Sequence, residues 1–154
     1  MTTRKQIDDF LGQKRLAVVG VSRSPKDFTR ALFRELRLRG YDLVPVNPGV
    51  PEVEGIRCYD RVQDVSPPVE SALLLTKPPV TDQVVRECAQ AGVRRIWMFR
   101  AAGPGAVSHG AAALCEAKGV SMIAGECPFM FLPGAALFHR VHGFCRKLFG
   151  TYPR

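Results

Sequence analysis

Stretches of continuous apolar, often β-branched residues alternate along the chain with stretches whose apolar residues recur every three or four positions. The first pattern is typical of strands covered on both faces, and the second of helices with one buried stripe. We expect strands at 16–20, 41–48, 71–76, 94–99 and 120–125, with a short edge strand near 56–59. We expect helices at 5–13, 25–39, 79–91, 105–118 and 135–149, with one helical turn near 60–65. The alternation predicts an α/β protein with a single domain over residues 1–154.

The helix after the first strand has a recognisable start signal. Ser24 is a favourable N-cap residue, and Pro25 is favoured at the first helical position. Phe28, Leu32 and Leu36 follow at helical spacing and predict the buried stripe. This helix is expected to start directly behind the loop that leaves the first strand.

The order of the strands follows from the right-handed crossovers that join parallel strands. The second expected strand lies on one side of the first, and the strand at 71–76 lies on the other. The result is a Rossmann-like, doubly wound parallel sheet of five to six strands with helices on both faces. Because the chain direction reverses there, a crevice opens between the loops after Gly20 and Thr76. Ligands of open α/β sheets bind in such a crevice.

Charge indicates an anionic partner. The formal net charge is +8, which suits a polyphosphate cofactor or a nucleic acid. The basic residues are scattered and form no nucleic-acid signature, which argues against nucleic acid.

No apolar run reaches the roughly 18 residues of a membrane span, and the N-terminus lacks the apolar region of a secretory signal. Five cysteines without C-x-x-C spacing predict reduced thiols in the cytoplasm.

The loop after the first strand, "GVSRSPK", contains one glycine where dinucleotide-binding loops usually have three. Gly20 permits a tight turn and close approach of a ligand. Ser22 and Ser24 offer hydrogen bonds, and Arg23 and Lys26 add positive charge suited to phosphate. We also expect the following helix N-terminus to favour an anion.

The end of the second strand argues against NAD. NAD-binding folds usually place Asp or Glu there for the ribose 2′-hydroxyl. Here Asn47 and Pro48 occupy the position, which leaves room for a ligand with a phosphate on its ribose.

The segments "AVVGVSRSPK", "GYDLVPVNPG", "VEGIRCYDRVQDV", "LLLTKPP" and "AGVRRIWMF" appear in this order between Arg15 and Gly125. In these segments the chain resembles the small single-domain CoA-binding proteins, which are similar to the N-terminal domain of the succinyl-CoA synthetase α subunit. The resemblance implies coenzyme A in the crevice. It assigns the phosphates to Gly20, Ser22, Arg23 and Lys26, beside Ser24. It assigns the adenosine end to Val46, Asn47 and Pro48, and the opposite wall to Thr76, Lys77, Pro78 and Pro79.

Phe99 and Arg100 depart from the pattern "W-x-Q-x-G" that often continues the fourth strand in this family.

The chain also lacks a nucleophile elbow, because "GVSRS" does not end in glycine. Cys127, with Arg100 as a cationic neighbour, is the best candidate for a reactive thiol, although an inert buried cysteine is the simpler interpretation. His139, His142 and Cys145 on the last expected helix are weak evidence for a metal site.

The sequence therefore predicts noncovalent binding of coenzyme A or an acyl-CoA by a stand-alone module without catalysis of its own. The alternatives are an NADP-dependent oxidoreductase and a nucleotide-sensing regulatory module. The phenylalanine-rich segment 128–150 is expected to pack on its own sheet, and pairing with a second copy or with a protein partner stays open.

Overall fold

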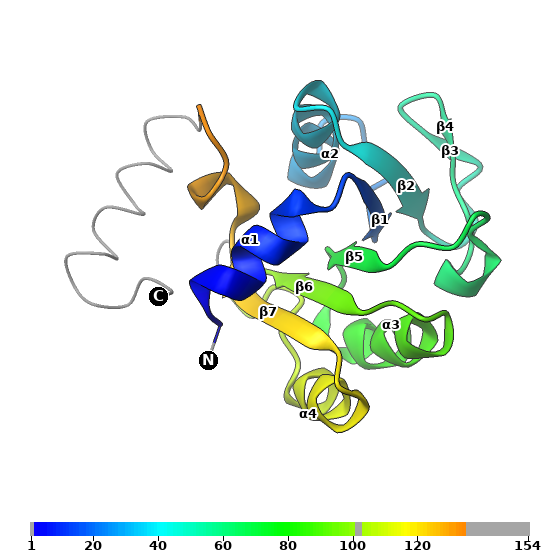
Figure 1. Ribbon diagram of the computed structural model, residues 1–154. Coiled ribbons are helices and arrows are strands. Elements are labelled where there is room, and N and C mark those ends of the chain that lie inside the picture. The colour runs from blue at the N-terminus through cyan, green and yellow to red at the C-terminus, as the bar shows by residue number, and fades with distance from the viewer. Residues whose placement is uncertain (1, 101–102, 135–154) are drawn as a thin grey trace.

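The computed structural model describes residues 2–100 and 103–134 (Figure 1). The helix expected at 135–149, with its histidines and Cys145, lies outside the described residues. Within them, no helix is long and apolar enough to cross a membrane.

Five parallel strands form the central sheet, as the sequence predicted. In spatial order they are β2 (Asp42–Val46), β1 (Arg15–Val19), β5 (Ser71–Leu74), β6 (Arg95–Phe99) and β7 (Ser121–Glu126). Every neighbouring pair is parallel. The order reverses between β1 and β5, where the sequence predicted the crevice.

Helices cover both faces of the sheet, so the fold is Rossmann-like and doubly wound. They are α1 (Arg4–Gly12), α2 (Phe28–Leu38), α3 (Pro78–Gln90) and α4 (His109–Lys118). In Figure 1, α1 and α2 lie on one side of the sheet, and α3 and α4 lie on the other.

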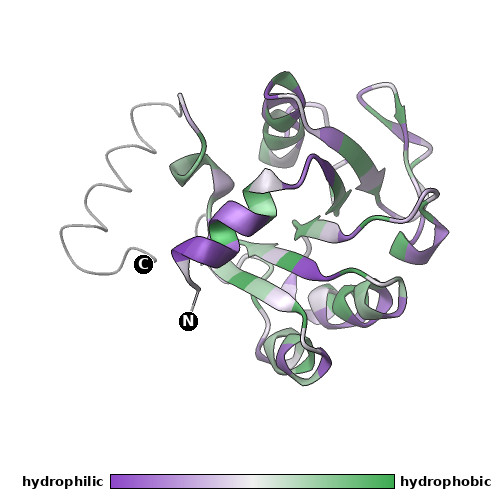
Figure 2. Cartoon of the chain, in the orientation of Figure 1, coloured by the Kyte–Doolittle hydropathy of each residue, from purple (hydrophilic) through white to green (hydrophobic). Residues whose placement is uncertain are grey.

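Side chains alternate along each strand between two separate cores. Leu16 and Val18 of β1 pack with α1 and α2, whereas Ala17 and Val19 pack with α3 and α4. The strands are therefore apolar at successive positions, as the colours in Figure 2 show for the centre of the sheet. This double burial explains why the strands were recognisable as continuous apolar runs.

The connection between β2 and β5 contains a small antiparallel ribbon of β3 (Glu52–Val53) and β4 (Ile56–Arg57). Two short 3₁₀ helices, Val62–Asp64 and Pro128–Met130, complete the described elements. The edge strand expected at 56–59 is thus one half of a hairpin.

The expected start of α2 is wrong. The helix begins at Phe28 with Asp27 as its N-cap, and residues 24–26 belong to the preceding loop. The Asp27 carboxylate accepts hydrogen bonds from the Thr29 N–H at 2.8 Å and the Thr29 hydroxyl at 2.5 Å. An aspartate cap with two bonds to one residue fixes the helix start three residues later than Ser24.

Two further expectations need correction. Phe28 does not join the buried stripe of α2, since 45% of its surface is exposed and its ring stacks on Phe99 with centroids 5.7 Å apart. Helix α4 begins at His109 rather than 105, because the Ser108 side chain caps it by accepting a bond from the Ala111 N–H.

Candidate functional site

Gly20 connects the ends of three strands. Its N–H donates to the Val46 carbonyl at the end of β2, with N and O 2.9 Å apart. Its backbone has φ +92°, and a Cβ at this position would lie 3.1 Å from Cγ2 of Thr76, just beyond β5. Only glycine adopts this conformation at this spacing without strain. The chain thus leaves β1 pressed against the end of β5.

The loop 21–27, which we call the phosphate loop, is held by its own polar groups. The Ser22 N–H donates to the Thr29 hydroxyl at 2.9 Å, and the Ser24 N–H donates to the Ser22 hydroxyl at 3.1 Å. Thr29 therefore serves both the helix cap and the loop. The sequence interpretation missed this residue, although a hydroxyl two positions after an aspartate cap is a usable signal.

Arg23 reaches from the phosphate loop to the loop that follows β2. Its Nη2 donates to the Pro48 carbonyl at 3.3 Å and lies 3.3 Å from the Cβ position of Gly49. The Arg23 side chain is exposed, as are Ser24 and Lys26. The loop after β1 and the loop after β2, both predicted to bind the ligand, are thus in direct contact through the Arg23 guanidinium group.

At the end of β2, Asn47 faces the phosphate loop. Its Nδ2 donates to the Val21 carbonyl at 2.8 Å. The Val46 side chain is only 2% exposed and belongs to the core, so it offers no side-chain surface to a ligand. Asp60, which the sequence interpretation did not single out, accepts a bond from the Gly49 N–H at 2.9 Å and braces this turn.

A cavity of about 470 Å³ lies beside the ends of β5 and β6. All four residues predicted for this wall line it: Thr76, Lys77, Pro78 and Pro79. The remaining lining includes Thr29, Phe99 and Ala106, so most of the surface is apolar. The sequence interpretation missed the loop after β6, where only a departure from the family pattern drew attention to Phe99.

The N-terminus of α2 is not open to an external anion in the expected way. The Asp27 carboxylate occupies it, and the hydrogen bonds from Thr29 lower the pKa of that carboxyl below its ordinary value of 3.8. An ionised carboxylate already complements the helix dipole. Positive charge at the site therefore comes from the exposed side chains of Arg23, Lys26 and Lys77.

Cys127 does not have the properties of a reactive thiol. It is 8% exposed, and burial raises its pKa above the ordinary value of 9.0, the opposite of what a nucleophile at neutral pH needs. Arg100 lies against the backbone of Gly125, with its Nη2 2.9 Å from the Cβ position there. The inert interpretation of Cys127 fits this geometry.

These features define a Rossmann-like α/β protein with exposed basic side chains on the loop after β1 and a mostly apolar cavity beside the ends of β5 and β6. Within that class, residues 14–133 match the family described as the CoA binding domain. The chain belongs to this family.

Relatives of two kinds are similar to the chain. The α subunit of acetate–CoA ligase (ADP-forming) II from Pyrococcus furiosus is 28% identical over 96 residues, which are 62% of this chain but 21% of that subunit. The uncharacterized protein YneT from Bacillus subtilis is 25% identical over 126 residues, 81% of this chain and 90% of YneT. The chain thus spans about a fifth of the ligase subunit and matches YneT over most of its length.

A solved structure, a hypothetical protein from Pyrococcus horikoshii OT3, has the same fold. It superposes with a TM-score of 0.75 at 28% identity and covers 82% of this chain and 87% of its own.

Proposed function

We propose that this protein binds coenzyme A or an acyl-CoA noncovalently in the crevice between the phosphate loop and the cavity beside β5. The observation that carries the proposal is the meeting of three strand ends around Gly20 in a chain of the CoA-binding domain family. The proposed site has a charged end, formed by the phosphate loop and the turn after β2, and an apolar end, formed by the cavity beside β5. The ligand extends from one end to the other.

The charged end suits the phosphates of coenzyme A. Arg23, held over the turn at Pro48 and Gly49, stands between the two loops where a phosphate bridges them. A guanidinium can clasp a phosphate with two hydrogen bonds. Lys26 and Lys77 supply further exposed charge, and Ser24 supplies a hydroxyl.

The apolar end suits the pantetheine arm. A cavity of about 470 Å³ lined by prolines, Phe99 and Ala106 accepts a narrow, mostly apolar chain. The adenosine end then lies beside Asn47 and Pro48. We propose that the protein acts by binding alone, holding or sensing the cofactor for a partner protein, without a reaction of its own.

Calorimetric titration of the purified protein with coenzyme A, acetyl-CoA, NAD and NADP tests the proposal. We expect saturable binding of the two CoA ligands, weakened about tenfold by Arg23→Ala, the loss of one charge-assisted hydrogen-bonding group. Arg86→Ala is the matched control, because Arg86 is exposed on α3 and contacts Gln83 instead of the crevice. Binding of NADP without CoA would support the oxidoreductase alternative instead, and silence with all four ligands would refute the proposal.

A further inference from the structure

Glu54 occupies an unfavourable backbone position. It forms the two-residue turn between β3 and β4 with Gly55, and its φ is +51° while that of Gly55 is +75°. Within residues 2–100 and 103–134, Glu54 is the only non-glycine residue with positive φ. Turns of this kind favour Asn, Asp or Gly at the first position. A glutamate in this strained backbone conformation suggests that the interactions of its side chain outweigh the strain.

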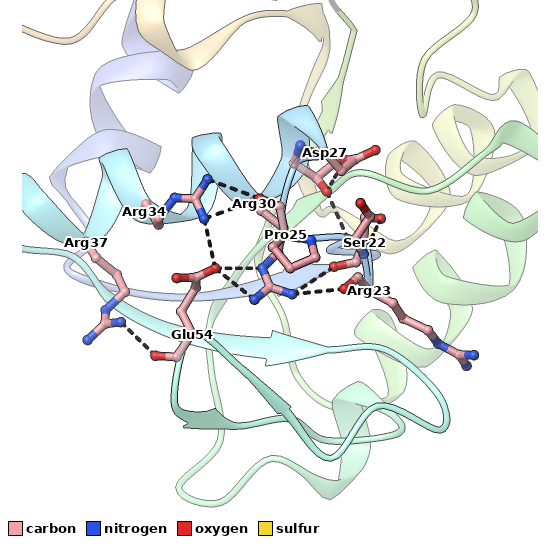
Figure 3. A network of polar contacts seen from close by, with 10 residues as sticks. Ser22, Arg23, Pro25, Asp27, Arg30, Arg34, Arg37 and Glu54 are labelled. Carbon is pink, nitrogen blue, oxygen red and sulfur yellow. Dashed lines mark hydrogen bonds and ion pairs between the residues drawn. The ribbon is translucent and has the colours of Figure 1, made fainter.

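The side chain of Glu54 is directed at helix α2 (Figure 3). Its Oε1 accepts hydrogen bonds from Nε of Arg30 at 2.8 Å and from Nη1 of Arg34 at 3.1 Å. Nη2 of Arg30 lies 2.8 Å from the same oxygen. The side chains of Arg30 and Glu54 are 12% and 20% exposed, so their contact is shielded from salt better than a surface pair. The Arg34 side chain is 44% exposed, so its contact with Glu54 is less shielded. The Arg30 hydrogen bond, followed by further attraction to Arg30 and Arg34, lowers the pKa of the Glu54 carboxyl.

The same two arginines hold the carbonyl oxygens of the phosphate loop. Nη1 of Arg30 donates to the Ser22 carbonyl at 3.2 Å and to the Arg23 carbonyl at 3.4 Å. Arg34 donates to the Pro25 carbonyl at 3.3 Å. Figure 3 shows both guanidinium groups between the loop and the carboxylate of Glu54.

This arrangement leaves the loop in a form suited to an anion. Carbonyl oxygens repel phosphate, and three of them are satisfied by α2. The backbone N–H groups of Arg23 and Lys26, in contrast, donate to no group in the described part of the chain. A loop with a single glycine can therefore present donors to a phosphate, because arginines bind its carbonyl groups from behind.

We propose that Glu54 is a positioning residue for the phosphate loop, acting through Arg30 and Arg34 to keep the loop ready for the phosphates of coenzyme A. This inference rests on the proposed function. Arg30 and Arg34 lie one turn apart on α2 and repel each other, and the single negative charge of Glu54, bound to both, offsets this repulsion. Without it, the two side chains separate and the loop loses its support.

Glu54→Asn tests this role without threatening the fold, since Asn suits the turn better than Glu and lacks the charge. We expect the better turn residue to offset the lost ion pairs, so that Tm changes little while the affinity for coenzyme A falls about tenfold, as for the loss of a charged hydrogen-bonding partner. If Glu54 only stabilised the fold, Tm and the affinity for coenzyme A would fall together. Glu54→Gln, nearly the same shape as Glu, should show the same loss of affinity.

Arg37→Gln is the matched control. Nη1 of Arg37 donates to the Glu54 carbonyl at 3.1 Å, so this change loosens the hairpin without touching the phosphate loop or the carboxylate. We expect its affinity for coenzyme A to stay within about twofold of wild type, a difference well below one hydrogen bond. Wild-type affinity in both Glu54 variants would overturn the inference.

Amide hydrogen exchange in the free protein separates this inference from the proposed function. The N–H groups of Ser22 and Ser24 should exchange faster in Glu54→Asn than in wild type or Arg37→Gln, with the core amide of Leu75 as internal reference. If wild type fails to bind coenzyme A, the proposed function is wrong, and exchange alone still decides the role of Glu54. Unchanged exchange at Ser22 and Ser24 would overturn that role.

Discussion

The Cβ position of Gly20 lies 3.1 Å from Cγ2 of Thr76, so the strand ends β1 and β5 touch where the strand order reverses. The carbonyl carbon and oxygen of Leu75 are nearly as close, at 3.2 and 3.3 Å. Backbone atoms cannot move aside as a flexible side chain can. The φ of +92° at Gly20 adds strain for any other residue.

Gly20→Ala should therefore destabilise the fold by about 1–3 kcal/mol, from left-handed strain and overpacking together, and abolish binding of coenzyme A. Urea unfolding measures the first effect and calorimetry the second. Gly12→Ala is the control, since Gly12 ends α1 with no atom within 4 Å of its Cβ position. A Gly20→Ala variant as stable as wild type would show that the strand ends are not tightly apposed.

Asp27 combines a structural role with a charge beside the phosphate loop, and two substitutions separate them. Asp27→Ala removes the cap and should cost about 1 kcal/mol of stability. Asp27→Asn keeps a capping oxygen and removes the negative charge, so coenzyme A should bind a few-fold more tightly. Scanning calorimetry measures the stability of both variants, and calorimetric titration measures their affinity for coenzyme A. Unchanged affinity in Asp27→Asn would place the phosphates far from this end of α2.

The stability effect of Asp27 should also depend on pH. Its pKa in the folded protein is below the ordinary 3.8 because Thr29 donates two hydrogen bonds to the carboxylate. A lowered pKa stabilises the fold above 3.8, and this contribution is lost as the pH falls through the lower folded-state pKa. Thermal unfolding of wild type should therefore become more acid-sensitive in this window than that of Asp27→Asn.

The sheet could be predicted from sequence because each strand is apolar on both faces. Leu16 and Val18 fill one core while Ala17 and Val19 fill the other, so neither face leaves a polar interruption. Such runs, separated by helical patterns, determine the strand order through right-handed crossovers. The crevice and the segments around it follow from that order alone.

The start of α2 was missed because two cap signals compete within four residues, and the local signal of Thr29 after Asp27 was not used. Ser24 followed by Pro25 is as favourable locally as Asp27. The choice depends on Thr29, whose hydroxyl binds both Asp27 and the Ser22 N–H, and on Arg30, which reaches Glu54 across 24 positions of the chain. Contacts of this range are not encoded in periodicity, which explains why the residues supporting the phosphate loop were missed.

If the cavity beside β5 holds the pantetheine arm, narrowing it should weaken binding of coenzyme A but not of its adenosine end alone. Ala106 is buried against the cavity, so Ala106→Leu should narrow the space for a pantetheine arm. We expect affinity for coenzyme A to fall about tenfold, as for a poorly fitting methylene-rich group, while adenosine 3′,5′-bisphosphate binds as before. Ala113→Leu, on an exposed face of α4, is the control. Equal loss for both ligands would indicate a disturbed fold instead, which thermal unfolding would reveal.

Two buried cysteines, Cys88 and Cys127, should differ in their reactivity from unfolded thiols. Burial raises the pKa of Cys127 above 9.0 and that of Cys88 to about 12. Each unit of increase lowers the thiolate fraction about tenfold, and only the thiolate is alkylated at an appreciable rate. In the native protein at neutral pH, iodoacetamide should therefore modify Cys127 far more slowly than in urea, and Cys88 more slowly still. Mass spectrometry of peptides from a time course resolves the two sites. If Cys127 reacts natively at the rate of an unfolded thiol, it is accessible and its pKa is not raised; a rate above that of the unfolded thiol would indicate an activated cysteine and would count against binding without chemistry.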